Sequence, residues 1–348
     1  MTPELVFLQL LALLLFWMLL PLLPALLELA RPKDAAPLQS VGSDSGKLTY
    51  FATSFTERAH RDGLLGVTVP PRMSDGTPVV GFSRVVPFLD PRRPIESVVV
   101  LLDSVPLPDS LEFSAEVLAR LSMPPSRGNT FRAILGQRDV SLGENSVVLR
   151  WVHALGLLQV AAGCRLFGRA TSSRSIILGT GVLFERLQAP VIRVTETEAY
   201  QPPARPTGSY ERFQPRDGEE ITEGMWHVNG DVRIPAESLF AGSIVARGDV
   251  VIGDGARVTG SIKSHGKILA KSRGLVAGSL TAREDITVEA GARVNGPIIS
   301  ETSVLLEAAV IGSSTSPSTV TAPQIEMLPG ATVYGAVMAG KRGVTSLS

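Results

Sequence analysis

Apolar and small residues recur at a fixed spacing of 18 positions through the last third of the chain. Two columns are aliphatic, a third is glycine, and a fourth lies two positions after each glycine. The columns are Val232, Val250, Ile268, Ile286 and Val304; Ile234, Ile252, Ala270, Val288 and Leu306; Gly242, Gly260, Gly278 and Gly296; and Ile244, Ile262, Leu280 and Ile298. A register kept without gaps over several repeats indicates a solenoid, in which each repeat is one coil stacked on the next.

Each repeat also alternates within itself with a period of two. In the coil 249–266, three inward pairs recur every six residues: Val250 and Ile252, Ala256 and Val258, and Ile262 and Ser264. Alternation by two indicates strands, and recurrence by six indicates three short strands per coil. The predicted fold is therefore all-β, a parallel β-helix of roughly triangular section. The glycine column is expected at the coil corners, where positive φ is favourable for glycine.

A weaker copy of the same register precedes this block. Val140, Leu158 and Ile176 differ by 18, as do Leu142, Val160 and Leu178. Upstream, a strand is expected at 97–102 and a short helix at 114–121, from the spacing of its apolar residues. At the other end, Ile325 follows Val304 by 21 positions instead of 18, and a corner loop over 313–322 accounts for the extra residues.

The most apolar segment, Leu5–Leu27, predicts an N-terminal transmembrane helix that contacts the lipid bilayer. As a helix it would be about 34 Å long, enough to cross a membrane. A cleaved signal peptide would need a basic N-terminal region, which is missing, and a buried core helix would have a polar face. Arg31 and Lys33 follow the segment, so the positive-inside rule predicts an external N-terminus and a cytoplasmic bulk. The expected location is a bacterial inner membrane.

These patterns divide the chain into six segments. They are a transmembrane anchor (1–34), a linker and irregular segment (35–96), a degenerate β-helix block (97–194), a second linker (195–225), the regular β-helix (226–340) and a tail (341–348).

Composition leaves little material for catalysis. The 33 basic and 33 acidic residues balance, which argues against a nucleic-acid partner. The single cysteine, Cys164, excludes an intrachain disulfide and a multi-cysteine metal site, and its inward column predicts a buried, unreactive side chain. No cofactor, no metal and no catalytic residue is predicted.

One enzyme class remains as an alternative, because the run IGDGARV at 252–258 is also similar to the hexapeptide-repeat acyltransferases. Those enzymes need a histidine base. His265 is the one histidine within the regular coils, and the equivalent position in the next coil, Arg283, offers no carboxylate partner. We therefore predict a solvated corner histidine. The other histidines are His153, at an outward position, and His60 and His227, outside the coils.

The run DVVIGDGARVTGSI that starts at Asp249 resembles the bactofilins, bacterial polymer-forming cytoskeletal proteins. The resemblance covers about Val228 to Ala339. It implies a right-handed parallel β-helix that assembles end to end into non-polar filaments without nucleotide, often at a membrane, as a scaffold. Two features depart from the family, the membrane segment and the long N-terminal half, whose extra coils could cap one end of the solenoid.

The expected function is that of a membrane-anchored, non-enzymatic scaffold. A solenoid that ends in an unpaired coil exposes strand edges, which must be capped or will pair with another copy. The expected self-association surface is the last coil, with Ile325, Met327, Val333 and Val337. A capped, monomeric β-helix that binds client proteins is the alternative within the same fold.

Overall fold

The computed structural model describes residues 9–11, 13–14, 16–18, 48–84, 89–195, 210–215 and 218–346. The chain divides into two compact units, 1–47 and 48–348. In the first unit the described residues are helical, and apolar side chains such as Leu14 and Trp17 are exposed. The predicted membrane span Leu5–Leu27 lies mostly outside the described residues. Among those that are described, no helix is both long and apolar enough to cross a membrane.

The regular β-helix is confirmed, because the C-terminal block (residues 211–345) stacks three parallel faces. The first consists of β13 (Met225–Val228), β16 (Ser243–Ala246), β19 (Ile262–Ser264), β22 (Leu280–Ala282) and β25 (Ile298–Ser300). The second consists of β14 (Val232–Ile234), β17 (Val250–Ile252), β20 (Ile268–Ala270), β23 (Ile286–Val288) and β26 (Ser303–Leu306). The third consists of β15 (Ser238–Phe240), β18 (Arg257–Val258), β21 (Leu275–Val276), β24 (Arg293–Val294) and β27 (Val310–Ile311).

Neighbouring coils of this block pair in the predicted register of 18. Val250 lies opposite Ile268, and Ile268 lies opposite Ile286. The aliphatic columns are buried, and polar members of the inward columns find partners within the coil: Ser264 Oγ, for example, donates to the Gly248 carbonyl over 2.7 Å. Because equivalent side chains stack directly on one another, the narrow core consists of small aliphatic residues.

Two long strands close the block at its C-terminal side. β28 (Ser318–Met327) runs along two faces and β29 (Thr332–Thr345) along all three. Val304 pairs with Ile325 as expected from their spacing of 21. The extra residues form a loop at 312–317, shorter than the predicted loop 313–322, since β28 already begins at Ser318. β29 continues to Thr345, so most of the segment expected to be a tail is strand.

The N-terminal block (residues 79–194) is also a parallel solenoid, and the predicted columns through Val140 and Leu142 are confirmed. Most of its long strands follow one or two faces, its short strands form the remaining face, and the last strand, β10 (Leu183–Val194), runs along all three. The block begins with β1 (Val79–Phe82) and β2 (Val98–Leu101). Its long strands are β3 (Glu112–Ala119), β4 (Thr130–Gly136), β6 (Val147–Ala154), β8 (Arg165–Ser172) and β10. The short strands are β5 (Val140–Leu142), β7 (Leu157–Val160) and β9 (Ser175–Leu178).

A helix covers the outside of this block. α3 (Tyr50–Arg61) buries Ala52, Phe55 and Ala59 against the outward side chains of the first strands, and the Phe55 and Trp151 rings lie 5.8 Å apart. The helix predicted at 114–121 is wrong, since these residues belong to β3 and the turn after it. The strand predicted at 97–102 is confirmed by β2. The segment predicted over 35–96 as linker and irregular therefore contains the covering helix and the first coil strand.

Candidate assembly interface

Coil ends are the candidate functional surfaces of this protein, because the backbone groups of a terminal strand have no partner in their own coil. The two solenoid blocks have four such ends between them. The inner end of each block is its C-terminal coil, and the outer end is its N-terminal coil. Whether each end is paired, covered or open decides what the protein can bind.

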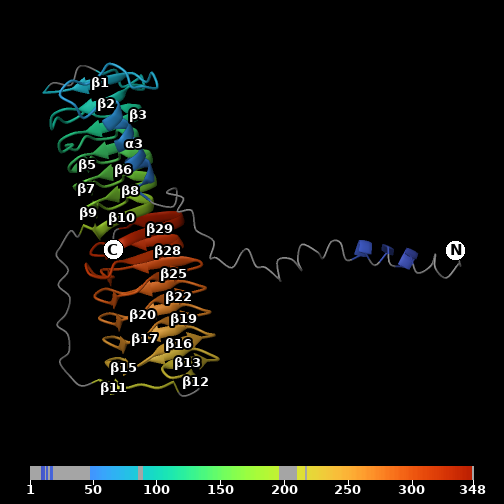
Figure 1. Cartoon of the computed structure of the whole chain (residues 1–348). Coiled ribbons are helices and arrows are strands. Elements are labelled where there is room, and N and C mark those ends of the chain that lie inside the picture. The colour runs from blue at the N-terminus through green and yellow to red at the C-terminus, as the bar shows by residue number, and fades with distance from the viewer. Residues whose placement is uncertain are drawn as a thin grey trace. The chain divides into compact units, whose positions relative to one another are not determined.

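The two inner ends pair with each other within the chain. β10 lies antiparallel to β29 along its whole length, with Leu183 opposite Val344, Leu187 opposite Val337 and Ile192 opposite Val333. Parallel partners occupy the other side of both strands, β8 and β9 next to β10, and β27 and β28 next to β29. Figure 1 shows β10 next to β29. We call this pairing the junction.

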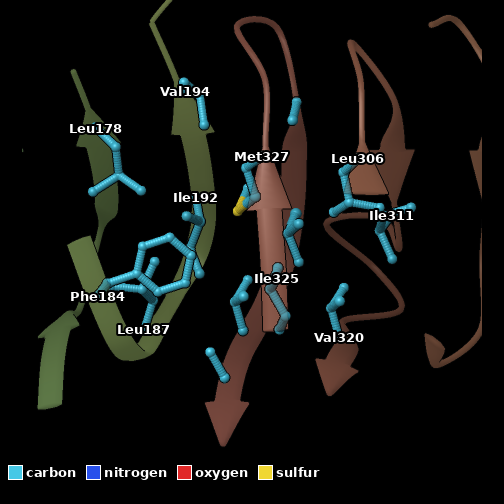
Figure 2. Close-up of a cluster of buried hydrophobic side chains, with 14 of the residues drawn as sticks. Leu178, Phe184, Leu187, Ile192, Val194, Leu306, Ile311, Val320, Ile325 and Met327 are labelled. Carbon is cyan, nitrogen blue, oxygen red and sulfur yellow. The ribbon is translucent and has the colours of Figure 1, made fainter. Parts of the chain in front are cut away.

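The junction also joins the two hydrophobic cores. Figure 2 shows side chains of both blocks facing the same interior, with Phe184, Leu187 and Ile192 from β10 and Ile325 and Met327 from β28. The Phe184 ring lies against Gly343, where an added Cβ would collide with the ring. Buried apolar residues therefore run from one block into the other without a break.

The four residues expected to form a polymerisation end lie at this junction. Ile325 and Met327 are buried on β28, and Val333 and Val337 are buried on β29, where they face Ile192 and Leu187 of the same chain. Their role in polymerisation remains a prediction, and contact with another copy would require β10 to move away.

The C-terminal segment strengthens the junction. The Thr345 hydroxyl, which is fully buried, accepts from the Val182 N–H over 2.9 Å and donates to the Gly179 carbonyl over 2.7 Å. Its backbone also bonds to Gly181 and Val182. At the other end of β10, Val194 exchanges backbone hydrogen bonds with Gly330 and Ala331. The junction is thus fixed at both of its ends.

The outer end of the C-terminal block is covered on two faces. β11 (Glu211–Arg212) pairs with β15, and β12 (Gly218–Thr222) pairs with β13 in an antiparallel hairpin. Phe213 and Trp226 pack against the end of the core. Ile221 and Met225 stay exposed beside Glu219 and Glu220, charged residues of the kind that protect strand edges.

The third face of this outer end is open, because β14 pairs with β17 alone among the described strands. Alternate residues of a parallel strand bond to the same neighbour. The Val232 N–H donates to the Asp249 carbonyl and the Ile234 carbonyl accepts from Gly253, so both residues bond toward β17. The N–H and carbonyl of Arg233 point to the opposite side, where no described strand lies.

The outer end of the N-terminal block is different. There the Val98 N–H donates to the Pro78 carbonyl and the Leu102 N–H donates to the Phe82 carbonyl, so Val79 points away from β2. The Val79 N–H nevertheless has a partner, because it donates to the Pro71 carbonyl over 3.0 Å. Gly81, the other outward residue of β1, has Val69 beside it. The chain thus covers this edge itself.

The corner glycines Gly242, Gly260, Gly278 and Gly296 stack in successive coils, directly before strands of the first face. An added Cβ on Gly260 would collide with the carbonyl of Gly242 one coil earlier, and one on Gly278 would meet the Gly260 carbonyl. Close approach of backbone to backbone thus requires glycine in this column. The positive φ that the sequence suggested occurs at Gly242 but not at Gly260, Gly278 or Gly296.

Reactive side chains contribute little to these surfaces. His265 is half-buried in the turn after β19, away from the coil ends. His153, predicted to face outward, is buried; its Nδ1 lies 2.7 Å from Thr171 Oγ1, and burial lowers its pKa. Burial raises the pKa of the Cys164 thiol to about 11, so the thiol stays protonated at neutral pH. No group of three metal-ligating residues occurs in the described part of the chain.

These features define a class of protein, a parallel β-solenoid of two blocks that pair through their inner coil ends. Residues 218–316 match the family described as "Bactofilin: Polymer-forming cytoskeletal", so the C-terminal block contains a bactofilin domain and the resemblance is confirmed. The match ends before β28, and the strands of the junction lie outside it. Neither the curated proteins nor the solved structures gave a match.

Proposed function

We propose that this protein is a non-enzymatic structural scaffold that self-associates through the outer end of its C-terminal block. The observation that carries the proposal is the open edge of β14 in a domain whose family is described as polymer-forming. An edge strand with unused backbone groups forms hydrogen bonds with another strand readily. The Arg233 N–H and carbonyl supply such groups, and the exposed Ile221 and Met225 nearby supply apolar area.

Arg233→Pro tests this surface. Proline removes the one outward N–H of β14, while the bonds of Val232 and Ile234 to β17 remain. In a symmetric contact each of the two copies loses the hydrogen bond from this N–H, and each lost bond costs about 1 kcal/mol of association free energy. We expect the self-association constant of the full chain, measured by sedimentation velocity, to fall at least about tenfold.

Arg233→Ala is the matched control, since it keeps the backbone donor and removes the same side chain. It should associate more tightly than the proline variant, and both should unfold at similar denaturant concentrations. Equal association of the proline variant and the unchanged protein would remove β14 from the contact.

We propose further that Leu5–Leu27 anchors the scaffold in a bilayer, with the N-terminus outside. The support is the length and apolarity of the segment and the basic residues that follow it. Leu13→Arg with Leu14→Arg should cost about 5–7 kcal/mol of insertion free energy, so the protein should leave the membrane fraction on alkaline extraction. The control, Leu13→Ala with Leu14→Ala, should stay in the membrane fraction. A reporter fused after Ser348 that is active outside the cytoplasm would contradict the orientation.

A capped monomeric scaffold is the second candidate, favoured by the junction, which closes one coil end within the chain. Particles that remain monomeric at every concentration would support it against self-association.

A further inference from the structure

We infer that the N-terminal block is a built-in stop that restricts self-association to one end of the chain, so that two copies close into a dimer, outer end to outer end, without extending into a polymer. The inference rests on the proposed self-association and deepens it by naming the partner, a second copy, and the extent of assembly. A chain with one pairing end forms a closed, symmetric contact, whereas a chain with two can continue indefinitely.

The junction shows how coil ends of this chain recognise each other. The terminal strand of one block pairs antiparallel with that of the other, and the two cores merge. The β14 edge offers the same kind of backbone groups, but the described chain has no second open coil end that could pair with it. A second copy supplies an identical edge, and antiparallel pairing of two identical edges is a two-fold contact.

The length of the intervening segment is compatible with a junction made within one chain. β10 ends and β11 begins on the same face, seven strand spacings apart through β29, β27, β24, β21, β18 and β15. At about 4.8 Å each this is about 34 Å. The 16 residues from Thr195 to Tyr210 can reach about 55 Å when extended. A chain can therefore close its own inner end, and the high effective concentration of a tethered block favours this over a neighbour's block.

The remaining end adds no second site. The outward N–H of Val79 on β1 is bonded to Pro71, and Val69 lies beside Gly81, so the chain itself covers β1, whereas no described strand lies beside Arg233 on β14. The stop thus has two parts, a coil end that pairs with β29 and an opposite end that its own chain covers.

The test uses the full chain in two forms. In the first, Gln188→Cys with Ala336→Cys places cysteines at directly opposed positions of the junction. Cys164 is buried with a raised pKa and does not compete. We expect a disulfide within one chain, seen as monomer mobility on a non-reducing denaturing gel, and the locked protein should sediment as a dimer at most. Disulfides between chains, or long polymers of the locked protein, would overturn the inference.

In the second form, Leu187→Asp places a carboxylate in the buried junction and should release β29. Two pairing ends are then open, and we expect at least a tenfold rise in particle mass, with filaments in negative stain. Gln188→Asp, on the exposed side of the same strand, should remain dimeric. Phe184→Ala is the milder release variant, for which a smaller shift in the same direction is expected. If both release variants stay at the size of the unchanged protein, the stop is refuted.

These outcomes separate the inference from the proposed function. A strictly monomeric unchanged protein would reject self-association at β14. Leu187→Asp would still test the stop in that case, because an exposed β29 should join two copies. A Leu187→Asp protein that stays monomeric would refute the stop.

Discussion

Leu187→Ala is expected to lower the free energy of unfolding by about 2–5 kcal/mol, the range for large-to-small changes in a closed core. Leu187 is fully buried on β10 and lies opposite Val337, so its side chain belongs to the cores of both blocks. The cavity cannot collapse easily, because strands on both sides hold β10 in register. Equilibrium denaturation of the full chain measures the effect.

Gln188→Ala is the control for that change. It lies next to Leu187 on the same strand, with its side chain exposed, and should change stability by less than about 0.5 kcal/mol. Similar small effects for both substitutions would mean that the junction contributes little to the folded state, contrary to the shared core.

Gly260→Ala is expected to destabilise the C-terminal block by roughly 3 kcal/mol, the upper part of the range for overpacking. The added Cβ would collide with the backbone carbonyl of Gly242, and a backbone atom cannot rotate away as a side chain can. Moving it would disturb the pairing of β16 with β19 on the first face. Thermal unfolding followed by circular dichroism gives the shift.

Gly230→Ala provides the matched comparison in the same block. Nothing lies within 4 Å of a Cβ built at Gly230, so the substitution should be nearly neutral or slightly stabilising. If Gly260→Ala were as neutral as Gly230→Ala, the close approach of successive corners would not be essential to the coil.

The regular coils could be predicted because their pattern is repeated. Each inward column stacks on itself at a spacing of 18, so the register of Val250 on Ile268 follows directly from the sequence. A loop could be predicted, at 313–322, because it interrupts that spacing, although the observed loop is 312–317.

The start of the N-terminal block was harder, because α3 covers its strands. A strand with one face in solvent alternates between apolar and polar residues. In contrast, β2 is buried at all four positions, and the last three residues of β3 are buried in succession. Such continuous apolar runs do not distinguish strand from helix, which explains the wrong helix at 114–121. The covering helix itself has buried residues at Ala52, Phe55 and Ala59, a helical spacing within an otherwise polar segment that could have revealed it.

The junction had no periodic signal at all. β10 shows an inward apolar set, but antiparallel pairing between two ends of a chain leaves no repeat that identifies the partner. The segment after Ala339 contains Lys341 and Arg342 and looks like a polar tail, yet its buried Gly343 and Thr345 fit against Phe184 and Val182. The sequence therefore predicted the last coil as the assembly surface, and the structure was needed to identify the open edge of β14 instead.

Sedimentation velocity of the full chain over a wide concentration range tests the central claim most directly. The account predicts a reversible step from monomer to dimer that weakens at least about tenfold in Arg233→Pro and is little changed in Arg233→Ala. A monomer at all concentrations, or assembly that the proline substitution leaves unchanged, would contradict it.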